Sequence, residues 1–214
     1  METSYFEPWV GESYGTTKVL ILSESVYSWR EDEKLIDPPP SHTKDNVRWW
    51  GIEHFGKRGY YTSMGRALCG AKEPALNERR KTWNEYALTP FVQSSVGEGW
   101  RSRPTKKQWQ NAAACFPSLI ENLRPHKIIV TGKTMWNYHM PDCTGPYLCD
   151  DLQAYKLSDG SLVWCLAVPH PASRKLKEGF QWERVGRAIH AFKSVPFPLR
   201  EDLFDPSIGS KDNG

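Results

Sequence analysis

The segment at residues 18–29 (KVLILSESVYSW) restricts the possible folds more than any other part of the chain. Its first half is an aliphatic run, which is typical of a strand buried on both faces of a parallel sheet. The run leads directly into Ser23, Glu24 and Ser25. In open α/β sheets, ligands bind in the crevice beyond the carboxyl ends of the strands. The segment therefore predicts a carboxylate, that of Glu24, at a ligand-binding edge.

A second segment repeats this arrangement in the last third of the chain. The apolar run at residues 162–168 ends in Pro169, His170 and Pro171. Because the carboxyl ends of parallel strands meet at one edge of a sheet, we expect the His170 imidazole and the Glu24 carboxylate to share that edge.

Further apolar runs at residues 86–92 and 127–131 alternate with helical patterns, the clearest of which follows Thr105. Strands that alternate with helices predict an α/β fold whose central sheet has four strands, is mostly parallel and is covered by helices on both faces. The Pro-rich residues 28–45 predict an extended surface loop, a candidate lid. Asp159 and Gly160 indicate a hairpin, which gives the last main strand an antiparallel partner.

The length of 214 residues suits a single domain, which we assign to residues 1–195, with a C-terminal tail at residues 196–214. Aromatic residues make up 13% of the chain and the formal net charge is +3. This mild positive charge is compatible with nucleic-acid binding but does not require it. Support for nucleic-acid binding therefore has to come from local clusters of basic residues.

The five cysteines form no CxxC pair, so the sequence predicts neither a disulfide framework nor a zinc site, and we expect no metal. The N-terminal residues lack the apolar core of a signal peptide. No apolar run approaches the ~20 residues that span a bilayer. We therefore expect a monomeric cytoplasmic protein with no membrane partner.

Two common classes of hydrolase fit the sequence poorly. Gly132, Lys133 and Thr134 follow a strand, as the end of a P-loop motif does. A P-loop also needs a glycine five residues before Gly132, and that position is Lys127. Ser23, Ser25 and Ser173 do not lie in the Gly-x-Ser-x-Gly elbow of serine hydrolases. A Glu paired with a His remains suited to a hydrolysis that develops positive charge on a sugar and negative charge on a departing base.

These residues resemble the uracil-DNA glycosylase superfamily over most of residues 18–195. Ser23 to Tyr27 stand where the best-known branch has Gly-Gln-Asp-Pro-Tyr, and His170 to Ser173 stand where it has His-Pro-Ser. The strand ends near Phe91 and Gly132 match in order, as does the helix after Phe180. The resemblance implies an enzyme that flips a nucleotide out of DNA and cleaves its N-glycosidic bond without a cofactor.

The resemblance also implies roles for the candidate site residues. Glu24 activates water or stabilises the oxocarbenium-like sugar, and His170 stabilises negative charge on the departing base. Ser25 stands where the best-known branch has its water-positioning Asp, so the chemistry is open between Glu24 and a water held by Ser25. Tyr27, Phe91 and Gln93 are the candidate base-binding residues. The Asn that reads uracil is missing near Phe91, so a preference for uracil is not supported.

Two basic clusters flank this predicted site and give local support for DNA binding, to duplex or single strands. One surrounds the start of the helix that follows Thr105, where backbone donors can also hold phosphate. The other follows His170 directly. The candidate DNA-binding residues are Arg101, Arg103, Lys106, Lys107, Ser173, Arg174 and Lys175.

The sequence thus predicts a DNA glycosylase that leaves an abasic site at an aberrant or modified base. A sharper hypothesis is that the base is a bulky modified pyrimidine of phage DNA, excised in antiviral defence. Two alternatives stay open, namely a non-catalytic reader of flipped or modified bases, motivated by Ser25, and a hydrolase of free nucleosides.

Overall fold

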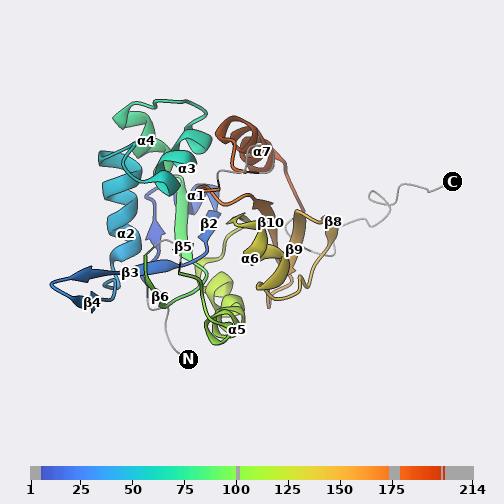
Figure 1. Ribbon diagram of the computed structural model, residues 1–214. Helices are drawn as coiled ribbons and strands as arrows, with labels where there is room; N and C mark the ends of the chain where they lie inside the picture. Colours follow the sequence, from blue (N-terminus) through green and yellow to red (C-terminus); the bar gives the residue numbers. More distant parts are fainter. Residues whose placement is uncertain (1–5, 100–101, 174–178, 199, 201–214) are drawn as a thin grey trace.

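The computed structural model describes residues 6–99, 102–173, 179–198 and 200. Strands alternate with helices along these residues (Figure 1). The strands are β1 (Trp9–Val10), β2 (Val19–Ser23), β3 (Val26–Glu31), β4 (Lys34–Ile36), β5 (Tyr86–Pro90), β6 (Ser95–Glu98), β7 (Lys127–Thr131), β8 (Tyr147–Cys149), β9 (Leu152–Lys156) and β10 (Leu162–Val168). The helices are α1 (Tyr14–Thr17), α2 (His42–Asn46), the π-helix η1 (Val47–Glu53), α3 (Gly59–Cys69), α4 (Leu76–Trp83), α5 (Lys106–Leu123), α6 (Lys133–Tyr138) and α7 (Trp182–Ser194).

Over the described residues, the main sheet has seven strands in the order β1-β5-β2-β7-β10-β9-β8. Its centre, β5-β2-β7-β10, is parallel, with Ile21 of β2 opposite Leu88 on one side and Ile129 on the other. The outer strands are antiparallel. The α/β class is confirmed, but the prediction of a four-stranded, mostly parallel sheet is wrong, because the sheet is larger and mixed. Strands β1 and β8, with two and three residues, are too short to produce a periodic pattern.

Alternate residues of the central strands face two separate cores. Leu20 and Leu22 of β2 pack in the cluster that contains Phe116 of α5, whereas Val19 and Ile21 pack in the cluster that contains Met64 of α3 and Ile189 of α7. Helices thus cover both faces, with α5 and α6 on one side and α3 and α7 on the other (Figure 1). Burial on both faces is why β2 is continuously apolar and why the first polar residues mark its end.

The segment at residues 28–45 differs from the predicted extended loop. Strand β3 continues to Glu31, forms a hairpin with β4, and pairs on its other side with β6, giving a second, three-stranded sheet. The turn places Asp32 and Glu33 at φ values of 44° and 63°. Tight hairpin turns with two positive φ angles usually use Asn or Gly. Because the turn contains two acidic residues in place of Asn or Gly, the sequence does not predict this hairpin.

Close packing of α7 on α3 gives a first prediction. A Cβ added at Gly186 would lie 2.8 Å from the Ala67 carbonyl oxygen, a backbone atom that cannot rotate away. Overpacking of this kind costs about 1–3 kcal/mol, while replacing a helical Gly by Ala regains about 1 kcal/mol. We expect Gly186→Ala to lower the free energy of unfolding, measured by chemical denaturation. Gly15→Ala in α1 is the control and should not lower it, because no atom of the described residues lies within 4 Å of the added Cβ.

Candidate functional site

The carboxyl edge of the parallel strands contains the topological switch point of the sheet. From β2 the chain crosses to β5 on one side, and from the neighbouring β7 it crosses to β10 on the other. The crevice between such strands is where open α/β sheets bind ligands. Strand β2 ends immediately before Glu24, and β10 ends two residues before His170. Both predicted residues therefore follow central strands at this edge.

Glu24 lies in the two-residue interruption between β2 and β3. The backbone after β5 holds this turn, because Phe91 N donates to the Ser23 carbonyl at 2.7 Å and Val92 N donates to the Glu24 carbonyl at 3.0 Å. The side chain is half-buried, and burial raises the pKa of the carboxyl group, an effect that the nearby Arg103 opposes. A carboxylate in this state can accept a proton from water more readily than an exposed one.

His170 is a neutral imidazole with a defined tautomer. Its Nδ1 accepts a hydrogen bond from Ala172 N at 3.2 Å, so the ring proton is on Nε2. Burial, and then the positive charge of Arg103, lower the pKa of His170 to about 4. At neutral pH the ring can therefore donate a hydrogen bond from Nε2 to a ligand without carrying a full positive charge.

Tyr60 and Thr131 also belong to this edge, although sequence reasoning did not assign them to the site. Thr131 Oγ1 donates its proton to the Leu22 carbonyl at 3.0 Å. The Tyr60 hydroxyl lies 3.0 Å from Thr131 Oγ1 and is therefore the donor in the hydrogen bond between these two side chains. The Tyr60 ring centroid lies 5.7 Å from that of His170. Tyr60 thus ties the start of α3 to β2 and β7 beside the imidazole. No spacing pattern links two residues 71 positions apart.

Ser25 follows Glu24 directly in the interruption between β2 and β3, and Tyr27 is the second residue of β3. Burial and then the Glu24 carboxylate raise the pKa of the half-buried Tyr27 hydroxyl, while Arg103 lowers it and donates a hydrogen bond to it. The Ser25 hydroxyl also lowers the pKa of Tyr27, but within the described part of the chain no group meets the buried Ser25 Oγ at full hydrogen-bonding geometry. A buried hydroxyl of this kind is suited to holding a water or a ligand oxygen.

Phe91 and Gln93 have structural roles in the protein. Phe91 is 2% exposed and packs in the core, with its ring centroid 6.0 Å from Trp109 and 5.8 Å from Phe116. The Gln93 amide nitrogen donates to Thr89 and to a backbone carbonyl, and its oxygen accepts from Phe6 N at 3.2 Å. Core packing therefore explains the position of Phe91, and hydrogen bonds within the protein explain that of Gln93. Neither position requires a bound base.

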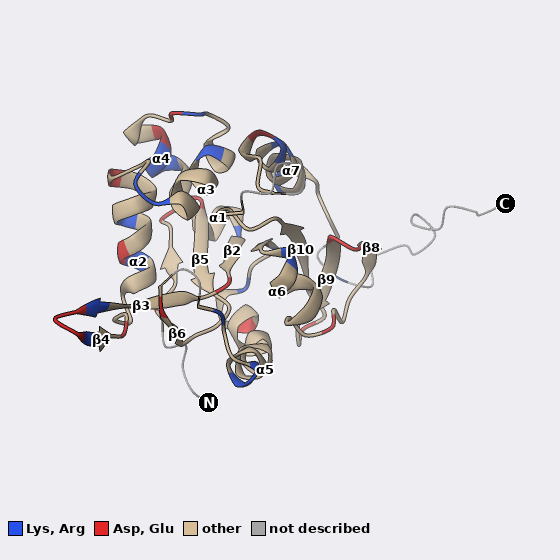
Figure 2. Ribbon diagram, viewed as in Figure 1, with Lys and Arg blue, Asp and Glu red and all other residues tan. Residues whose placement is uncertain are grey.

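The predicted DNA-binding residues are in different environments. Arg103 reaches the site, Lys106 and Lys107 are exposed in the first turn of α5, and Ser173 donates its backbone N–H to the His170 carbonyl at 2.8 Å. Figure 2 shows further basic residues on α3, α4 and α7, so positive charge is not confined to the predicted face. Arg101, Arg174 and Lys175 lie outside the described residues.

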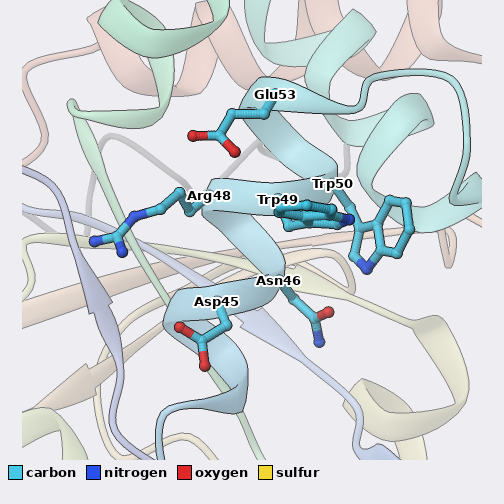
Figure 3. A pocket seen from close by; sticks show the side chains of 6 residues that line it. All are labelled: Asp45, Asn46, Arg48, Trp49, Trp50 and Glu53. Carbon is cyan, nitrogen blue, oxygen red and sulfur yellow. The ribbon is translucent and has the colours of Figure 1, made fainter.

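A cavity of about 470 Å³ lies elsewhere, along α2 and η1 (Figure 3). Its lining includes Trp49, which is 48% exposed, but neither Glu24 nor His170. All lining residues come from one continuous helical segment, and they are Asp45, Asn46, Arg48, Trp49, Trp50 and Glu53. We consider this cavity a weaker candidate for the functional site than the sheet edge. The edge brings together the ends of four strands and two side chains of complementary chemistry, Glu24 and His170.

Comparisons with known proteins add no assignment. No protein-family model matches this chain, and no curated protein matches it in sequence. Over the described residues, no three His, Cys, Asp or Glu side chains gather closely enough to hold a metal ion. None of the helices in that part of the chain is both long enough and apolar enough to cross a membrane.

Proposed function

We propose that this protein is a DNA glycosylase that excises an aberrant or modified base and leaves an abasic site. The observation that carries the proposal is the neutral, Nε2-protonated His170 at the same sheet edge as the half-buried Glu24. This pair matches the two charges that develop when an N-glycosidic bond breaks. In this proposal, residues 1–195 act as a monomer in the cytoplasm and need no cofactor.

The reaction requires the nucleotide to leave the stack before chemistry begins. The bond between C1′ of the sugar and the base nitrogen then breaks, and its electron pair leaves with the base. Glu24, aided by the Ser25 hydroxyl, orients a water, stabilises the sugar cation and takes the proton that the water releases as its oxygen bonds to C1′. Nε2–H of His170 donates to an oxygen of the departing base, which finally takes up a proton from solvent.

The preferred substrate in this proposal is a bulky modified pyrimidine of phage DNA, excised as an antiviral defence. Its support is the replacement of the uracil-reading pattern near Phe91, whose ring packs in the core. Tyr27 is the ring best placed beside Glu24 to contact the base. A preference for uracil in otherwise unmodified DNA would contradict this choice of substrate.

A second candidate is a non-catalytic reader that captures a flipped or modified base. It is favoured by Ser25, whose buried hydroxyl can hold a ligand but cannot act as a base in the way an Asp would. A reader would bind modified DNA with salt-dependent affinity and leave its glycosidic bonds intact.

The deciding experiment compares duplex and single-stranded DNA that contain uracil, hypoxanthine, 5-hydroxymethylcytosine or glucosylated 5-hydroxymethylcytosine. We expect alkali-sensitive sites to form at one modified pyrimidine and to be absent from the matched unmodified strand. Binding is measured in parallel at several salt concentrations. Tight, salt-sensitive binding without alkali-sensitive sites on any substrate would contradict the glycosylase and favour the reader.

A further inference from the structure

A group of aromatic side chains lies at the surface on η1 and just after it. Trp49 is 48% exposed, and its ring centroid lies 6.2 Å from that of Trp50 and 4.0 Å from that of His54. The guanidinium carbon of Arg58 lies over the Trp50 ring, 5.0 Å from its centroid. We call these four residues the aromatic surface. Exposed apolar groups rimmed by polar side chains mark sites of interaction with a ligand or partner.

The π-helical geometry of η1 explains why these rings meet outside the core. Gly51 and Ile52 are buried on the inner side of the helix. His54 N donates to the Trp49 carbonyl, five residues earlier, at 2.7 Å. This spacing is one residue longer than in an α-helix, and it brings the His54 ring against the Trp49 ring on the outer side.

Positive charge accompanies the rings. Arg48, Lys57 and Arg58 are exposed, and none of the three forms an ion pair within the described part of the chain. Two carboxylates, those of Asp45 and Glu53, also line the cavity along this helix. In the view of Figure 3 they extend with Arg48 to one side of the helix, whereas both tryptophan rings lie on the other side. The cation that contacts the rings is Arg58.

An exposed ring beside an unpaired cation suits a nucleic-acid strand whose bases are not paired. Each base can stack on an aromatic face while a neighbouring phosphate binds the cation. The cavity of about 470 Å³ lies within the range of roughly 300–1,000 Å³ for sites that enclose small ligands, so a base can enter it. A duplex cannot use the rings in this way, because its bases are stacked inside the helix.

The aromatic surface is also connected to the candidate site. Helix α3 begins directly after Arg58, and Tyr60 in its first turn has its ring centroid 5.7 Å from that of His170. A strand that contacts Arg58 can therefore continue toward the sheet edge.

We propose that the aromatic surface binds an unpaired stretch of a DNA strand, with a base stacked on Trp49 and a phosphate held by Arg58. The choice of DNA as the partner rests on the proposed glycosylase function. The inference adds to that function a preference for substrates with unpaired nucleotides near the base to be excised. Because this surface contains neither Glu24 nor His170, its binding of DNA requires no modified base.

The test measures the affinity for a labelled, unmodified DNA strand without self-pairing, and for the blunt duplex that it forms with its complement, by fluorescence anisotropy. Trp49→Ala is expected to weaken binding of the single strand by about 10-fold, the contribution of one stacked base. Trp49→Phe, which keeps a ring, should retain most of the affinity. On the duplex, Trp49→Ala and the wild type should bind alike. Arg58→Gln should reduce the salt dependence of single-strand binding.

The matched control is Tyr147→Ala, which removes a 60% exposed ring from the edge strand β8 and should leave both affinities unchanged. Thermal unfolding checks that each variant is folded. The proposal is overturned if the wild type does not bind the single strand at low salt, if Trp49→Ala binds it as the wild type does, or if Trp49→Ala weakens single-strand and duplex binding equally. Single-strand binding that depends on Trp49, without excision of any base, would support this surface and contradict the glycosylase. Excision without such binding would do the reverse.

Discussion

Glu24→Gln is expected to slow base excision by about 100-fold to 10,000-fold, the usual contribution of a general base. Gln has nearly the shape of Glu, but its amide oxygen cannot take a proton from water and carries no charge to stabilise an oxocarbenium-like sugar. Because burial raises the pKa of Glu24, a neutral side chain at this position relieves an unfavourable buried charge. The variant should therefore fold at least as stably as the wild type while losing activity.

The measurement is the single-turnover rate of abasic-site formation with protein in excess, alongside DNA affinity from fluorescence anisotropy. Glu31→Gln is the matched control, because Glu31 lies exposed at the end of β3, seven residues further along. It should retain the wild-type rate. A Glu24→Gln variant with near wild-type rate and affinity would assign the chemistry elsewhere, whereas retained affinity with a lost rate supports Glu24 as the base.

The central strands could be predicted because their physical environment is simple. A strand buried on both faces must be apolar throughout, so β2 and β10 are visible as continuous runs, and the residues directly after them are fixed at the sheet edge. Glu24 and His170 were found by this rule. The outer strands β1 and β8 are partly or fully exposed and very short, so no period distinguishes them from loops.

The other contacts of the candidate site depend on packing between distant segments. Phe91 lies at the predicted strand end, but its side chain turns into the core below the edge, a choice that its position in the chain does not reveal. Tyr60 reaches Thr131 only because α3 packs over the ends of β2 and β7. Arg103, in the segment after β6, lowers the pKa of Tyr27, and no pattern in the sequence predicts the second sheet in which β6 pairs with β3.

His170→Ala is expected to slow base excision by about 100-fold to 1,000-fold, the usual cost of removing one preorganised donor to a developing anion. The Ala172 N–H bond to Nδ1 fixes the ring with Nε2–H as the donor, so the loss should fall on the bond-breaking step more than on DNA affinity. His170→Gln, which can offer an amide N–H in place of Nε2–H, should recover part of the rate. His190→Ala, at an exposed position on α7, is the control and should match the wild type.

The pH dependence separates a neutral His170 from a charged one. With a pKa of about 4, the ring is neutral above that pH and gains its charge only below it. The contribution of His170, measured as the ratio of wild-type to His170→Ala rates, should therefore stay constant from about pH 5 to about pH 8 and change only in more acidic solution. If the imidazolium were the active form, the ratio would instead fall steadily as the pH rose above the pKa of His170, across this same window. A ratio that falls in this way would contradict the neutral donor, and with it the observation on which the glycosylase proposal rests.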